Sequence, residues 1–164
     1  MSRLIPLMAV MLAVAPAASA QSKAIGRYND WRVYTECELR SMVCFAAVEA
    51  SDMAPKAADH GEVTFYVAAF KSGAATSQPS LRVGYSLRSD LAPAAIVGRD
   101  RFPMYAAGQE AFFPDDREKP LLDALKKGQE LRVEATSVKD ARMAYHFSLK
   151  GSRDAIDKAK ALCK

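Results

Sequence analysis

The sequence has few of the residues from which most catalytic and metal sites are built. Its 164 residues include two histidines, three cysteines and one tryptophan. It contains no Cys-x-x-Cys, no His-Glu-x-x-His, no Gly-x-Ser-x-Gly and no glycine-rich phosphate-binding loop. These absences argue against a thioredoxin-like redox site, a zinc site, an α/β-hydrolase and a nucleotide-binding enzyme. We therefore predict a non-enzymatic protein with no catalytic residues, no metal site and no cofactor.

Charge of one sign is not in large excess either. The formal net charge is +4 at pH 7, and lysines and arginines are spread along the chain with acidic residues between them. A nucleic-acid-binding protein usually gathers its basic residues on one face or stripe. The sharpest basic pair, Lys126-Lys127, falls at the end of a predicted helix, where cations are favourable. The distribution of charge therefore predicts no nucleic-acid partner.

The first twenty residues resemble a secretory signal. Arg3 precedes an apolar run from Leu4 to Val14, and Ala18-Ser19-Ala20 is the small-x-small pattern that signal peptidase cleaves. A membrane anchor is the alternative, but two prolines interrupt a stretch that would need roughly 20 apolar residues to span a bilayer. We expect residues 1–20 to be a cleaved signal peptide. A single domain over residues 21–164 would then be periplasmic, secreted or at the cell surface, with no membrane span.

Alternation of apolar and polar residues predicts a mainly β fold. Segments with this two-residue period are 31–37, 43–50, 80–87, 131–136 and 142–149. Further strands are expected over 63–70, which is rich in aromatic and branched residues, over 94–97 and 101–105, which flank the turn Gly98-Arg99-Asp100, and over 110–113. A short helix is expected over residues 117–127, with Gly128 as its C-cap, and Ser152 is expected to cap a final helix. Because the strands do not alternate with helices, we predict an antiparallel β-sandwich or barrel-like domain with two short helices, the second C-terminal.

The three cysteines predict one disulfide and one free or intermolecular thiol, because an exported protein with an odd number cannot pair them all internally. If segments 31–37 and 43–50 form a hairpin, Cys37 lies opposite Cys44, so a Cys37–Cys44 bond is one candidate. A Cys37 nucleophile paired with His146 is an enzymatic alternative, although export favours a disulfide or an inert thiol.

Several other residues have both a structural and a functional interpretation. We interpret Trp31 as a core anchor, with a ligand-stacking platform as the alternative. His60 and His146 lie in polar surroundings and are expected at the surface or rim. Asp115-Asp116 reads as a helix start, although two carboxylates could also form a catalytic pair. Phe112-Phe113 is expected to close the core, with an exposed aromatic contact as the alternative.

Six short segments spread from Asp30 to Cys163 share their order and spacing with a known family. They are Asp30-Trp31-Arg32-Val33-Tyr34, Val43-Cys44-Phe45-Ala46, Gly84-Tyr85, Gly108-Gln109-Glu110-Ala111-Phe112, Leu125-Lys126-Lys127-Gly128 and Phe147-Ser148-Leu149-Lys150-Gly151. Together with the signal they resemble the invasion-associated locus B family of exported bacterial proteins. The chain departs from the family at Lys139-Asp140-Ala141, where the family has Arg-Gly-Thr, and at Ser152, where it has Phe.

The resemblance implies a disulfide between Cys44 and Cys163, which leaves Cys37 as a possible free thiol without a counterpart in the family. It also implies an exported binding or interaction protein with an unknown protein or cell-envelope partner, linked in some pathogens to host-cell invasion and virulence. The family offers no catalytic residue set. The alternatives are a periplasmic envelope structural or stress-related protein with no host role and, as a minor one, a hydrolase.

Overall fold

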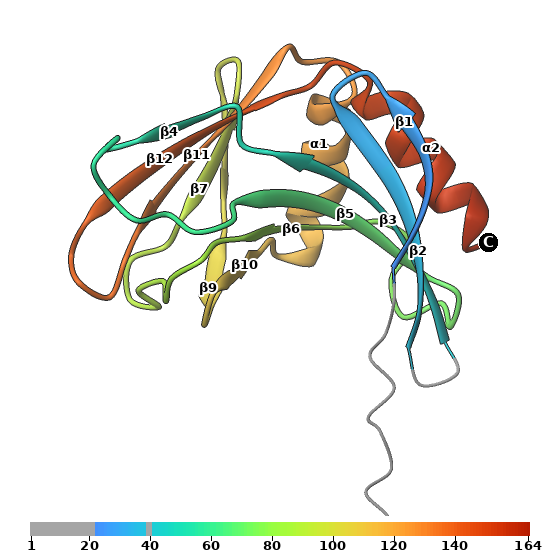
Figure 1. Ribbon diagram of the computed structural model, residues 1–164, viewed down its shortest axis with the longest axis horizontal. Helices are drawn as coiled ribbons and strands as arrows, with labels where there is room; N and C mark the ends of the chain where they lie inside the picture. Colours follow the sequence, from blue (N-terminus) through green and yellow to red (C-terminus); the bar gives the residue numbers. More distant parts are fainter. Residues whose placement is uncertain (1–21, 39–40) are drawn as a thin grey trace, which may run out of the picture.

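The computed structural model describes residues 22–38 and 41–164, so the expected signal peptide lies outside the described residues. Within these ranges the chain forms twelve strands and two helices (Figure 1). The elements are β1 (Lys23–Tyr28), β2 (Trp31–Glu38), β3 (Ser41–Glu49), β4 (Asp52–Ala54), β5 (Thr64–Phe70), β6 (Gln78–Arg82), β7 (Ala94–Val97), β8 (Asp100–Pro103), β9 (Tyr105–Ala107), β10 (Glu110–Phe112), α1 (Asp115–Leu125), β11 (Glu130–Thr136), β12 (Arg142–Ser148) and α2 (Ser152–Leu162). The predicted mainly β class is confirmed.

The strands form two antiparallel sheets. A seven-stranded sheet has the order β1-β2-β3-β5-β6-β10-β9, and a five-stranded sheet has the order β4-β12-β11-β7-β8. Neither sheet closes into a barrel, so the arrangement is a sandwich, with α2 as the last element of the chain. The segment that contains Pro103 forms β8 at the edge of its sheet, as expected for a strand that ends in a residue without an N–H donor.

The hydrophobic core lies between the inner faces of the two sheets. Phe65 of one sheet packs on Phe147 of the other with ring centroids 5.9 Å apart, and both side chains are fully buried. Leu121 and Leu125 of α1 and Ile156 of α2 complete the same core. Because successive strand residues point to opposite faces, each strand that supplies this core also presents side chains on the outer face of its sheet.

Trp31 is a core anchor and not a ligand-stacking platform. Its side chain is 0% exposed, and its indole Nε1 donates a hydrogen bond to the Ser148 carbonyl oxygen at 2.9 Å. Nearby, Gly151 has φ +87°, and a Cβ at this position would lie 2.0 Å from the Tyr28 carbonyl oxygen. The first and last segments that carry the family resemblance therefore meet in space and join the end of β12 to the β1–β2 hairpin.

The β2–β3 hairpin has a different register from the expected one. Cys37 lies opposite Met42 instead of Cys44. The strands pair up to the residues that flank 39–40, so the connection is shorter than the six residues that the prediction assumed. A shift of two residues keeps every side chain on its own face, which is why the expected inner face was still correct.

The helix ends also differ from the prediction. Helix α1 begins at Asp115, two residues earlier than expected, and Gly128 is not its cap. Instead, a Cβ on Gly128 would lie 2.6 Å from Val97 Cγ1, so the glycine allows close packing. The N-cap of α2 is Gly151, and Ser152 is its first residue. The Ser152 hydroxyl donates to the Leu125 carbonyl oxygen at 2.8 Å, which joins the two helices.

Candidate binding groove

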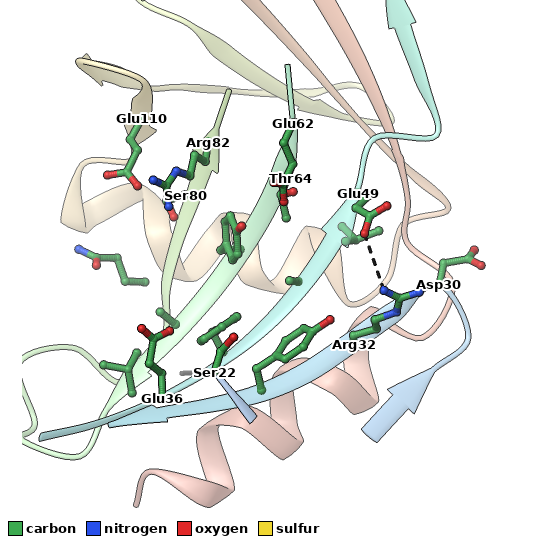
Figure 2. A pocket seen from close by; sticks show the side chains of 18 of the residues that line it. Ser22, Asp30, Arg32, Glu36, Glu49, Glu62, Thr64, Ser80, Arg82 and Glu110 are labelled. Carbon is green, nitrogen blue, oxygen red and sulfur yellow. Dashed lines mark ion pairs between the residues drawn. The ribbon is translucent and has the colours of Figure 1, made fainter. Parts of the chain in front are cut away.

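The outer face of the seven-stranded sheet forms an open groove of about 1060 Å³. Side chains from β2, β3, β5, β6 and β10 line it, and Figure 2 shows several of them on the same side of the sheet. These residues are the outward half of each alternating strand, so the strand period that builds the core also builds the groove. The groove lies on the face opposite the core, where no other described element covers it.

Strand register arranges the groove residues in rows that cross the sheet. One central row consists of Arg32, Ala47, Tyr66, Ser80 and Phe112. The second central row consists of Tyr34, Phe45, Ala68 and Gln78. A charged row at one end consists of Glu49, Thr64, Arg82 and Glu110. At the other end, Glu36, Val43 and Phe70 form the end row.

The central rows carry a contiguous group of aromatic side chains. The Tyr34 and Phe45 rings stack with centroids 5.2 Å apart, and the Phe45 and Tyr66 rings meet edge to face at 5.8 Å. Ala47 lies beside Tyr66, and Ala68 lies beside Phe45, in the cross-strand register. Because alanine side chains are short, the rings stand above two hollows in the floor of the groove. This surface combines exposed ring faces with space for ligand side chains.

Phe112 and Phe113 have separate roles. Both residues were expected to close the core. Phe113 is buried there, whereas Phe112 is half-buried and lines the groove. The Phe112 ring packs against exposed Tyr105 with centroids 5.9 Å apart. The prediction is therefore correct for Phe113 and wrong for Phe112, because adjacent residues of a strand face opposite sides of the sheet.

Acidic side chains outnumber basic ones in the groove, although the whole chain is positively charged. The charged lining residues are Asp30, Glu36, Glu49, Glu62, Glu110, Arg27, Arg32 and Arg82. Arg32 and Glu49 form an ion pair at 3.8 Å (Figure 2). Among the described residues, no ion pair involves Glu36, Glu62 or Glu110. At one end of the groove Glu62 and Glu110 outnumber Arg82, and at the other end the row of Glu36 contains no basic residue, so negative charge is in excess at both ends.

The Tyr66 hydroxyl lies close enough to the Glu62 and Glu110 carboxylates for their charge to affect its pKa. Burial raises the pKa of Tyr66, and the Glu62 and Glu110 carboxylates raise that pKa further, whereas the nearby Thr64 hydroxyl and Arg82 act in the opposite direction. Thr64 is 4% exposed, and its Oγ1 has no hydrogen-bond partner among the described residues. This end of the groove thus combines an aromatic ring with carboxylates.

His60 is buried, which contradicts its expected place at the surface or rim. It is 6% exposed, its Nε2 lies 2.8 Å from the Pro55 carbonyl oxygen, and its Nδ1 lies 3.2 Å from the Tyr145 hydroxyl. Because a carbonyl oxygen only accepts, Nε2 carries the proton and Nδ1 accepts from Tyr145. The Tyr145 oxygen lies 2.7 Å from the Tyr85 hydroxyl, so a hydrogen-bonded chain links three side chains inside the protein.

The Gly84-Tyr85 segment that contributes to the family resemblance holds this buried chain in place. The Gly84 N–H donates to the His60 carbonyl oxygen at 3.0 Å. A Cβ on Gly84 would lie 2.6 Å from the Gly61 Cα, so only glycine allows the two backbones to approach this closely. Tyr85 then reaches Tyr145. The arrangement fixes the loop around His60 on the core and positions no reactive group at a surface.

The other candidate catalytic residues are not assembled into a site. Cys37 lies on β2 of the seven-stranded sheet, whereas His146 lies on β12 of the five-stranded sheet, with its Nδ1 2.9 Å from Glu130 Oε1. Asp115 and Asp116 are exposed in the first turn of α1, where negative charge is favourable, and make no side-chain cap. Over residues 22–38 and 41–164, no group of three or more His, Cys, Asp or Glu side chains could hold a metal ion.

Cys44 and Cys163 form a disulfide, with Cα atoms 5.8 Å apart and a sequence separation of 119. This is the pairing that the family resemblance implies, and the alternative Cys37–Cys44 bond is not formed. Cys37 is exposed and free. The bond ties the end of α2 to β3, directly beneath the groove. In the described part of the chain, no helix is both long and apolar enough to cross a membrane.

The fold is thus that of an antiparallel β-sandwich whose C-terminal helix is linked by a disulfide to the groove-bearing sheet. A solved structure with a similar fold is the crystal structure of invasion associated protein B from Bartonella henselae. The TM-score is 0.55 at 15% sequence identity, and the match covers 87% of this chain and 97% of that chain. No family model matches the sequence, and no curated protein matches it. The shared fold supports the family resemblance that the sequence segments indicate.

The sequence contained a signal for the groove that the prediction did not use. Alternation along residues 31–37 puts Arg32 and Tyr34 on the face opposite Trp31 and Val33, and Phe45 and Tyr66 follow the same alternation in the next two strands of the sheet. Aromatic residues at outward positions of consecutive strands are unusual for a face that only contacts water. What the sequence could not provide was the register that places these rings together.

Proposed function

We propose that this protein is an exported binding protein of the invasion-associated locus B type, without catalytic activity, which recognises its partner through the groove on the seven-stranded sheet. The observation that carries the proposal is the group of aromatic side chains, framed by charged residues, on an otherwise uncovered sheet face. Aromatic residues dominate the energy of protein interfaces because they bury large areas at low conformational cost.

Within residues 22–38 and 41–164 the candidate catalytic side chains lie apart, which supports a binding role over the minor hydrolase alternative. His60 contacts the Pro55 carbonyl oxygen and the Tyr145 hydroxyl, and His146 contacts the Glu130 carboxylate. A purely structural envelope protein would need no such groove, so this second alternative is less well supported. Export to the periplasm or cell surface agrees with the disulfide, which persists in oxidising compartments. In its more specific form, the proposal is that the partner belongs to a host cell and that the protein contributes to virulence.

The proposal is tested by capturing partners from an envelope extract with two matched variants. Ala68→Arg fills the floor of the groove, and Ala144→Arg makes the same change on β12, outside the groove. We expect wild type and Ala144→Arg to retain the same partner and Ala68→Arg to lose it, while all three have similar circular dichroism spectra. Equal capture by all three proteins would show that the groove is not the binding surface.

The exported location requires a separate measurement. Cell fractionation followed by N-terminal sequencing should find the mature chain outside the cytoplasm, beginning at Gln21. A cytoplasmic chain that retains its first residue would contradict export. A broad esterase and peptidase screen is expected to give no turnover, and reproducible turnover that survives repurification would restore the hydrolase alternative.

A further inference from the structure

We infer that the groove binds an extended polypeptide segment that bears lysine or arginine side chains. This inference rests on the proposed function, because it assigns a ligand class to the same groove. The groove combines an aromatic centre with an excess of carboxylates at both ends, and each of these features recognises a cation or the apolar part of a long basic side chain.

The charge distribution is complementary to a basic ligand. Five carboxylates and three arginines line the groove, whereas the chain as a whole has a formal charge of +4. The acidic excess is therefore a property of this surface and does not reflect composition. Outside the Arg32–Glu49 ion pair, four carboxylates and two arginines remain, so the groove keeps an excess of two negative charges; the four carboxylates are Asp30, Glu36, Glu62 and Glu110, and the two arginines are Arg27 and Arg82. A polyanion would meet these carboxylates at close range, which disfavours a nucleic acid or an acidic glycan.

The spacing of the carboxylates favours a polypeptide over a small amine. Glu36 belongs to the end row and Glu110 to the charged row, and three two-residue steps along the strands separate these rows. At about 3.3 Å per residue the separation along the strands is roughly 20 Å, and four strand spacings of about 4.8 Å between β2 and β10 make the diagonal roughly 27 Å. A single amine cannot reach both ends, whereas an extended segment of about six to eight residues can, because its end side chains add to its reach.

The centre of the groove suits the rest of such a segment. The Tyr34, Phe45 and Tyr66 rings can receive the aliphatic stems or the cationic ends of lysine and arginine side chains. An ammonium group beside Tyr66 would also lie near the Glu62 and Glu110 carboxylates, which line the same end of the groove.

Recognition in this groove depends on side chains. The backbone groups of β2, β3, β5 and β6 already pair within the sheet, so the floor offers no edge for strand addition. Affinity for a basic segment should therefore rise with the negative charge of the groove and fall as salt screens that charge. Arg82, which lies between Thr64 and Glu110 in the register, repels a cation at the place where Glu62 and Glu110 attract it.

Binding of fluorescein-labelled hexalysine, measured by fluorescence anisotropy, tests the inference. Wild type should bind hexalysine more weakly as salt is raised. Glu62→Gln/Glu110→Gln should weaken binding about tenfold and Arg82→Gln should strengthen it severalfold, because each change alters the charge beside the bound ammonium groups. The matched control Asp100→Asn/Asp116→Asn removes two exposed carboxylates outside the groove and should leave the affinity within about twofold.

Hexaglutamate and a neutral hexasaccharide, labelled in the same way, provide the opposing outcomes. The inference is overturned if either of them binds more tightly than hexalysine, if hexalysine does not bind, or if the control pair weakens binding as much as the groove pair. These results are distinguishable from failure of the proposed function. If the groove is not the binding surface, Ala68→Arg will still capture the envelope partner. If only the ligand class is wrong, Ala68→Arg will still lose the partner, and hexalysine will fail the binding test.

Discussion

Removal of the Cys44–Cys163 disulfide should lower the stability of the protein by a large and calculable amount. The bond closes a loop with a sequence separation of 119 residues, which spans most of the described fold. In the chain-entropy model a closed loop of this length restricts the unfolded chain by about 4 to 5 kcal/mol. For a domain of this size the loss corresponds to a decrease in Tm of about 10 to 15 °C.

The perturbation is the double variant Cys44→Ala/Cys163→Ala, and the assay is equilibrium unfolding in urea followed by circular dichroism. Cys37→Ser is the matched control, because Cys37 is exposed and free, and its stability should stay within about 0.5 kcal/mol of wild type. Mass spectrometry of alkylated protein verifies one free thiol in wild type. If the double variant loses less than about 1 kcal/mol, the disulfide does not restrict the unfolded chain to the extent that the chain-entropy model requires.

Two further predictions concern the buried segment around His60. Gly84→Ala should destabilise the protein by about 1 to 3 kcal/mol in thermal or urea unfolding, because the new Cβ meets the Gly61 backbone; a neutral effect would contradict the close approach. Tyr145→Phe should cost about 1 to 3 kcal/mol at neutral pH, because His60 Nδ1 loses its donor. Burial, and then the neighbouring Tyr85, raise the pKa of Tyr145, so wild type keeps this contribution below the ordinary tyrosine pKa of about 10 and loses it as pH rises further. Urea unfolding of wild type and Tyr145→Phe across this range should therefore show a shallower alkaline loss in the variant, and equal slopes would refute the assignment.

Strands with clear alternation could be predicted from the sequence, whereas short or exposed ones could not. The segment around Leu131 and Val133 alternates regularly and forms β11. β1 (Lys23–Tyr28) was not predicted, because its residues are mostly exposed and include Gly26, so no apolar period marks it. β4 and β9 have three residues each and exist because a neighbouring strand pairs with them.

The buried position of His60 also depends on contacts that are remote in sequence. Its partner Tyr145 lies 85 residues away, so the polar residues around His60 suggested a surface loop. The groove was missed for the same reason. Alternation places Tyr66 and Phe112 on outward faces, but β6 lies between β5 and β10, and only the sheet order shows that the two residues share one row.

The central claim is that the groove on the seven-stranded sheet is the surface that contacts the partner. Hydroxyl-radical footprinting of the captured complex measures this directly, because aromatic side chains oxidise readily when solvent reaches them. Oxidation of Phe45 and Tyr66 should fall several-fold in the complex, while oxidation of Leu91, which is exposed outside the groove, stays unchanged. Unchanged oxidation of Phe45 and Tyr66 in a saturated complex, with protection elsewhere, would contradict the account.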